Sequence, residues 1–158
     1  MKFTRIIFFG VAVLTAVTTF AQNKTADTNM QILLEKVKAD KKLVVAANME
    51  LSDAEGKAFW PIYDGYQKEL QVLNDRVTKA ILAYADAYNK NGLTDAIATS
   101  LTNEVLVIDQ AEIAMRKNYS ARLSKVLPGR KVARYLQIEN KIRAAIRFEL
   151  AAGIPLIQ

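Results

Sequence analysis

The chain has 158 residues, with 22 Lys and Arg against 16 Asp and Glu, no His, no Cys and 51% hydrophobic residues. This length and apolar fraction suit one domain with a buried core. The absence of His and Cys excludes Ser-His-Asp triads, imidazole bases, thiol nucleophiles, zinc knuckles, iron–sulfur clusters and disulfides. Most familiar active-site chemistries are therefore excluded, and we expect no cofactor.

The first 21 residues have the pattern of a secretory signal peptide. Lys2 and Arg5 precede an uncharged, mostly apolar run over 6–20, and Ala21 completes the small-residue pattern of a cleavage site. The alternative, an uncleaved membrane anchor, calls for a longer run of ~20 apolar residues. No Cys follows the run to carry a lipid anchor. We expect residues 1–21 to be removed and the mature protein to be periplasmic, or secreted where there is no outer membrane.

The mature chain is expected to form one all-helical domain after a short leader. Residues 22–29 are polar and lack periodicity, which predicts a flexible leader, and the domain then covers residues 30–158. A first helix is expected from about residue 30 to residue 48. Its apolar pattern is weak over 38–42, so a break there is left open.

Ser52 and Glu55 predict the start of a second helix. A Ser followed three residues later by Glu is a capping box, in which the hydroxyl and the carboxylate each bind a backbone N–H of the first turn. Pro61 lies inside this helix, so we expect a kink, or a short first segment that ends near Trp60.

Two further helices follow from apolar residues that repeat in steps of three and four. The second helix should continue to Asn91-Gly92, and a third should begin at Thr94 or Thr102 and end at Val126. A fourth is expected over about 130–151. The positions predicted to face inward are Phe59, Tyr63, Tyr66, Leu70, Leu73, Val77, Ala80, Tyr84, Ala87, Leu101, Val105, Ile108, Ala111, Met115, Tyr119, Leu123, Val126, Val132, Tyr135, Leu136, Ile142, Ala145, Ile146 and Leu150.

Five acidic residues stand four positions before a basic one, a spacing that supports the helices. In a helix each such ion pair adds ~0.2–0.5 kcal/mol to helix stability. The pairs are Asp64–Lys68, Asp75–Lys79, Asp86–Lys90, Glu112–Arg116 and Glu139–Arg143. A single long helix cannot shield its apolar residues from solvent by itself. The second and third helices should therefore pair as an antiparallel hairpin. We expect a homodimer to complete the burial.

The charge is unevenly distributed. Residues 22–115 carry 10 basic and 14 acidic residues, whereas residues 116–158 carry 10 basic and 2 acidic ones. Such asymmetry suggests an anionic partner, and export makes nucleic acid a poor candidate. An acidic or unfolded client protein, anionic lipid or an acidic second subunit would fit, and a solvated helix face is the alternative. The predicted binding residues are Arg122, Lys125, Arg130, Lys131, Arg134, Lys141, Arg143 and Arg147.

The order of these features resembles the periplasmic LTxxQ-motif family of Spy and CpxP. Leu51, Ser52 and Glu55 match the first motif with Ser for Thr and Glu for Gln, and Leu127 alone is kept in the second. The resemblance implies a cradle-shaped antiparallel dimer whose concave basic face holds partly unfolded clients without ATP. CpxP-like relatives instead dock on the sensor domain of a histidine kinase. The metal-sensing relatives bind metal through His, which this chain lacks.

Other interpretations of single features remain open at this point. The aromatic residues Trp60, Tyr63, Tyr66, Tyr84, Tyr88, Tyr119 and Tyr135 could line a client surface, but helical spacing favours a core. Asp109 with Glu112, or Asp53 with Glu55, could serve acid–base catalysis or a metal site, yet Glu55 has a capping role and Glu112 has a neighbouring Arg. A hydrolase that uses only carboxylates is disfavoured by the scarcity of loops and Gly. We expect a chaperone-like binding protein or an accessory regulator of a membrane sensor or envelope complex, with no metal and no catalytic residue.

Overall fold

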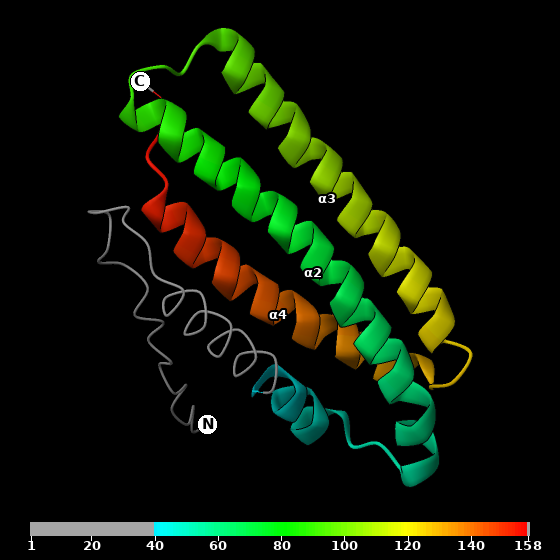
Figure 1. The fold of residues 1–158 in the computed structure, drawn as a ribbon. Coiled ribbons are helices and arrows are strands. Elements are labelled where there is room, and N and C mark those ends of the chain that lie inside the picture. Colours follow the sequence, from blue (N-terminus) through cyan, green and yellow to red (C-terminus); the bar gives the residue numbers. More distant parts are fainter. Residues whose placement is uncertain (1–39, 158) are drawn as a thin grey trace, which may run out of the picture. The chain divides into compact units, whose positions relative to one another are not determined.

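A computed structural model describes residues 40–157, and within this range every regular element is helical (Figure 1). A helical segment over 40–49 is followed by α2 (Asp53–Asn89), α3 (Asp95–Leu123) and α4 (Gly129–Gly153). The predicted all-α class is confirmed for this part of the chain. The predicted signal peptide, the leader and the start of the first helix lie outside the described residues. From Lys41 onward the chain forms one structural unit.

Helix α2 begins at the predicted capping box and does not break at its proline. The Ser52 hydroxyl accepts a hydrogen bond from the Glu55 N–H (3.3 Å), and the Ser52 N–H donates to Glu55 Oε2 (2.8 Å). The prediction of a short first segment ending near Trp60 is wrong, since α2 runs through Pro61. A proline removes one backbone hydrogen bond, and the buried Phe59 and Tyr63 on either side keep the helix packed.

Helix α3 begins at the earlier of its two predicted starts. The Thr94 hydroxyl accepts a hydrogen bond from the Ile97 N–H (3.3 Å), which caps the helix. Asn91 adopts a left-handed conformation with φ 52°, which allows the chain to reverse before Gly92. The helix ends at Leu123, earlier than the predicted Val126, because the chain turns from Ser124 onward.

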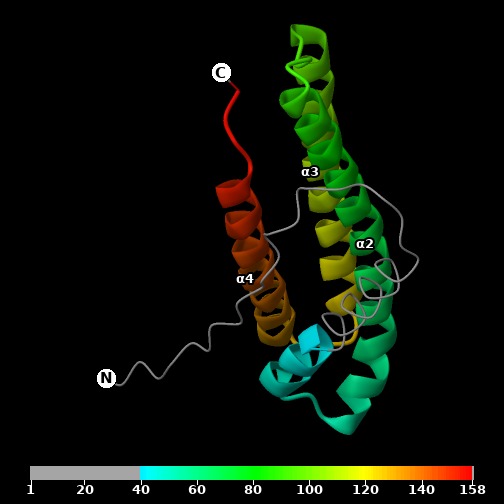
Figure 2. The ribbon, with the colours of Figure 1, turned by 60° about the vertical axis from the view of Figure 1, so that its left-hand side comes forward.

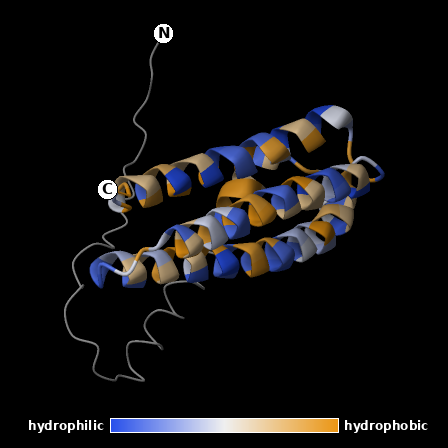
Figure 3. Ribbon diagram, turned by 90° about the horizontal axis from the view of Figure 1, so that it is seen from above, coloured by the Kyte–Doolittle hydropathy of each residue, from blue (hydrophilic) through white to orange (hydrophobic). Residues whose placement is uncertain are grey.

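Helices α2 and α3 lie side by side and run in opposite directions, while α4 lies along them (Figures 1 and 2). Contacts between α4 and α2 depend on long side chains. The ring of Tyr135 on α4 lies 5.2 Å from that of Phe59 and 5.7 Å from that of Tyr66, both on α2. Apolar and polar residues alternate along all three helices (Figure 3), as expected for amphipathic helices that each bury one face.

The core is concentrated where α2 begins and α3 ends. Its members come from segment 40–49, all three helices and the α3–α4 connection: Val45, Met49, Phe59, Tyr63, Tyr66, Leu73, Ile108, Met115, Tyr119, Leu123, Leu127, Val132 and Tyr135. Most predicted inward positions at this end are thus buried.

Burial declines toward the connection between α2 and α3. Val105 was predicted to face inward, but 45% of its surface is exposed, and Ala145, Ile146 and Leu150 of α4 are exposed as well. These four assignments are wrong within the described residues, because no helix of this range covers that end. Apolar side chains are therefore available at the surface there.

No helix in residues 40–157 has both the length and the apolar character needed to cross a membrane.

Candidate functional site

The eight predicted basic residues do not all face solvent, because four of them bind acidic groups of the same chain. Lys131 Nζ lies 2.6 Å from Glu55 Oε2 and donates to the Glu50 carbonyl oxygen at 2.9 Å. Arg134 forms an ion pair with the Glu50 carboxylate at 3.3 Å. Lys131 and Arg134 therefore attach the start of α4 to the connection before α2.

Arg143 and Arg147 bind the acidic residues of α3. Arg143 Nη1 lies 3.1 Å from Glu112 Oε1, and Arg147 Nη2 lies 3.0 Å from Glu112 Oε2 and 2.7 Å from Asp109 Oδ1. The hydrogen bond to Asp109 raises the pKa of Arg147. Glu112 is 6% exposed and bound on both oxygens, so this carboxylate pair joins two helices and is not arranged for acid–base catalysis.

The other four cations keep their charges at the surface. Arg122 lies over the ring of Tyr119, with its guanidinium 4.5 Å from the ring centroid. Lys125, Arg130 and Lys141 are exposed and make no ion pair with any residue in 40–157. Among the eight predicted residues, these four are the ones available for a charge-dependent contact, and we call them the exposed cations.

The residues of the two LTxxQ-like segments lie at the same end of the structure. Leu127 is buried in the core and Leu51 packs against it. The two segments cover residues 51–55 and 127–131, and their last residues, Glu55 and Lys131, form the 2.6 Å ion pair. Hydrogen bonds from Lys131 and from the Ser52 N–H lower the pKa of Glu55, because both favour its charged form. The two segments are thus joined by direct contacts.

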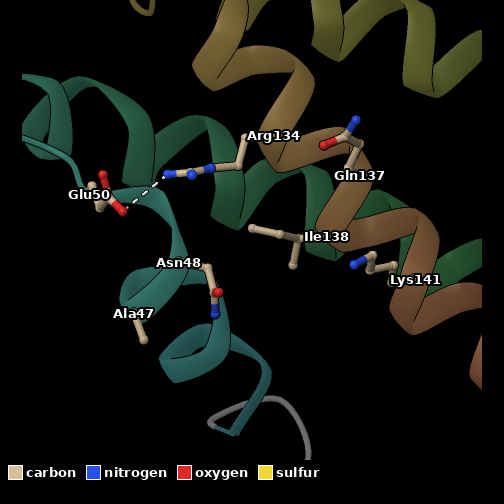
Figure 4. Close-up of a pocket in the computed structure, with 7 residues that line it drawn as sticks. All are labelled: Ala47, Asn48, Glu50, Arg134, Gln137, Ile138 and Lys141. Carbon is tan, nitrogen blue, oxygen red and sulfur yellow. Dashed lines mark ion pairs between the residues drawn. The ribbon is translucent and has the colours of Figure 1, made fainter. Parts of the chain in front are cut away.

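A small polar cleft of about 240 Å³ lies between the residues 47–50 and α4 (Figure 4). Arg134 reaches across it to Glu50, while Gln137, Ile138 and Lys141 line the side formed by α4. Because its acid is already paired, the cleft offers one exposed cation, Lys141, and no acid–base couple.

A buried network around Glu139 was missed by the sequence analysis. This carboxylate on α4 is 4% exposed, lies 2.7 Å from Lys41 Nζ and accepts a 2.8 Å hydrogen bond from Gln67 Nε2. Gln67 also donates to the Tyr135 hydroxyl at 3.3 Å. Burial, with the nearby charge of Glu139, raises the pKa of Tyr135. The signal was present, since Glu139 continues the spacing of Val132 and Tyr135 along one face of α4.

Only one of the five predicted pairs within helices forms, namely Asp86–Lys90 at 2.7 Å. The acidic residues of the others have different partners: Lys42 for Asp64, Gln71 for Asp75, Arg143 and Arg147 for Glu112, and Lys41 for Glu139. Most of these partners belong to another helical segment. In those cases an ion pair between two segments forms in place of the predicted ion pair within one helix.

The predicted aromatic core is confirmed at one end of the structure. Tyr63, Tyr66, Tyr119 and Tyr135 are buried, and Trp60 packs against them. The two other tyrosines of this prediction, Tyr84 and Tyr88, lie half-buried near the end of α2, with ring centroids 5.8 Å apart. These two rings therefore have part of their surface available to other contacts.

An apolar groove of about 310 Å³ lies beside Tyr84, between the second half of α2 and the first half of α3. Its walls include Val77 and Ile81 of α2 and Leu101 and Val105 of α3. The segment 154–157, which follows α4, lies along it, and the Tyr84 hydroxyl donates a 2.8 Å hydrogen bond to the carbonyl oxygen of residue 155. Because Val77, Leu101 and Val105 were expected to face inward, the sequence did not predict this groove.

The buried polar side chains of the described residues are all paired. Every buried side-chain nitrogen and oxygen in this range has a hydrogen-bond partner, and residues 40–157 contain no cluster of three or more acidic side chains that could hold a metal ion. Comparison with protein-family models, with curated proteins and with solved structures finds no match to this chain.

Proposed function

We propose that this protein is an exported, non-enzymatic binding protein of the Spy/CpxP-like kind, which holds partly unfolded polypeptides without ATP. The observation that carries the proposal is the number of large apolar side chains exposed on α3 and α4. Leu106, Ile113, Ile146 and Phe148 are each more than half exposed, and Phe148 reaches 73%. Surface apolar groups of this kind are typical of protein contact sites.

The exposed cations supply a second component of binding. Lys141 lies on α4 before Ile146 and Phe148. Lys125 lies in the connection that leads into this helix, and Arg130 lies in its first turn. Exposed charge attracts an anionic chain over a longer range than apolar contact does, and the apolar side chains then hold it. An unfolded client with acidic stretches suits both properties.

The likeness to the LTxxQ family is part of the same proposal. It is supported by the contact between the two LTxxQ-like segments through Glu55 and Lys131, and by the antiparallel packing of α2 and α3. We further propose a homodimer, since long helices with exposed apolar residues gain burial by pairing. Sedimentation of the mature chain at micromolar concentrations tests this state, and a monomer would remove the dimer from the proposal.

The deciding experiment is aggregation of a chemically unfolded client, measured by light scattering without ATP. The mature protein at an equimolar ratio should delay aggregation. The double variant Ile146→Ser/Phe148→Ser should lose much of this effect, because both side chains are exposed and their loss leaves the core intact. Ala144→Ser, also exposed on α4, is the matched control. No delay by the unmodified protein would contradict the proposed function.

A further inference from the structure

A short piece of this chain lies along the groove between α2 and α3 and forms part of its wall. Helix α4 ends at Gly153, and Ile154 follows it with φ −100° and ψ 114°, an extended backbone. Ile154 and Ile157 line the groove, while Leu156 is 88% exposed. The segment 154–157 thus places two aliphatic side chains against an apolar wall, in the manner of an extended peptide.

One polar contact fixes the position of the segment. The Tyr84 hydroxyl donates to the carbonyl oxygen of Pro155 at 2.8 Å. A backbone carbonyl is present in every peptide, so this hydrogen bond does not depend on the side chain of the residue that accepts it. Tyr84 therefore provides a contact that any extended segment can use, and the aliphatic walls select for apolar side chains on either side of it.

The segment covers the groove only loosely. Ile154 is 37% exposed and Ile157 is 59% exposed, although both contribute to the groove lining. Every residue from 148 to 153 is exposed too, and the last ion pair that holds α4 to α3 is made by Arg147. A segment attached by so few contacts can leave the groove at a small cost in free energy.

We propose that this groove is a binding site for an extended aliphatic peptide segment, and that residues 154–157 occupy it as an intramolecular competitor. The inference rests on the proposed function, since it adds a defined groove to the exposed apolar residues of α3 and α4 and names the chemistry of the polypeptide that is held. Attachment to α4 gives the segment a high effective concentration at the groove. An external peptide must displace it, so the intact chain binds such peptides more weakly than a chain without the segment.

The test uses a fluorescently labelled peptide with the sequence of residues 151–158, measured by fluorescence anisotropy. A chain that ends at Gly153 should bind this peptide at least ~10-fold more tightly than the intact chain. In the shortened chain Tyr84→Phe should weaken binding by roughly 3- to 10-fold through loss of one hydrogen bond. A peptide with Ser in place of both Ile residues is the control and should bind neither protein.

A second pair of variants tests the segment without removing it. Ile157→Ser in the intact chain should raise affinity for the labelled peptide, whereas Leu156→Ser should leave it unchanged, because Leu156 points away from the groove. Circular dichroism confirms that each protein keeps its helices. Tighter binding after removal or Ile157→Ser supports the inference whether or not the protein delays client aggregation. Equal affinity, or no binding, in all forms overturns it even if aggregation is delayed.

Discussion

The carboxylate of Glu139 on α4 lies 2.7 Å from the ammonium group of Lys41, and both side chains are largely withdrawn from solvent. Gln67 of α2 donates a further hydrogen bond to the same carboxylate. One buried acid thus joins segment 40–49, α2 and α4. A buried charge that loses its partner is costly, whereas the intact pair adds less to stability than its short distance suggests.

Replacing Lys41 should therefore destabilise the protein strongly. Lys41→Met leaves Glu139 buried without its cation, and we expect a loss of about 3 kcal/mol in the free energy of unfolding, measured by urea titration. Lys42→Met is the matched control, since Lys42 pairs with the exposed Asp64, and about 1 kcal/mol or less is expected. The double variant Lys41→Met/Glu139→Met should recover part of the loss. Equal effects at positions 41 and 42 would contradict this account.

Removing the cap of α2 should have a moderate effect on stability alone. Ser52→Ala deletes the oxygen that accepts the Glu55 N–H, and this should cost ~1 kcal/mol. Thermal unfolding followed by circular dichroism measures the loss, and Ser52→Thr, which retains a hydroxyl, is the control. If client holding disappeared while stability stayed unchanged, the LTxxQ-like segment would be a contact site instead of a cap.

Stability should fall in mild acid through Glu55 and Glu104. Both have a lowered pKa in the folded protein, Glu55 through Lys131 and the Ser52 N–H, and Glu104 through Arg76. In the unfolded chain both carboxyl groups have the ordinary pKa of 4.5. Their contribution to the free energy of unfolding is therefore complete above that pH, and it is lost as the pH falls through the lower pKa values of the folded protein.

Urea midpoints measured from about pH 6 down to about pH 3 test this dependence. Glu55→Gln and Glu104→Gln should each flatten the curve on the acid side. Glu149→Gln serves as control, because Glu149 is exposed and makes no ion pair within residues 40–157. The same slope in all four proteins would show that other groups govern acid unfolding.

Charge reversal should separate the binding cations from the structural ones. Lys125→Glu, Arg130→Glu and Lys141→Glu together should slow association with an acidic client and leave the Tm nearly unchanged, since these residues are exposed. Lys131→Glu with Arg134→Glu should lower the Tm, because both bind Glu50 and Lys131 also binds Glu55.

Salt provides an independent measure of the same effect. Raising it from about 0.05 to about 0.5 M should weaken client binding by the unmodified protein, because screening shortens the reach of exposed charges. The triple variant should show a smaller salt dependence. Association that responds neither to charge reversal nor to salt would show that the exposed cations are ordinary solvated surface.

The helices and their limits were largely predictable from the sequence because their causes are local. Ser52 and Thr94 cap helices within three residues of their own positions, and Asn91 permits the reversal before Gly92. The apolar spacing likewise identified the aromatic core, since residues three or four apart share a face of a helix. Pro61 was misjudged because packing on both sides holds α2 together despite one missing hydrogen bond.

The partners of charged and apolar side chains were decided only by the tertiary structure. Glu112 and Glu139 each have a basic residue four positions away in the sequence. In the structure Glu112 binds Arg143 and Arg147, and Glu139 binds Lys41, because long charged side chains can reach partners on neighbouring helices. Four of the predicted surface cations were neutralised in this way. The groove could not be predicted for the same reason. Sequence spacing shows which face of a helix is apolar, but the positions of the other helices and segments determine whether that face is covered.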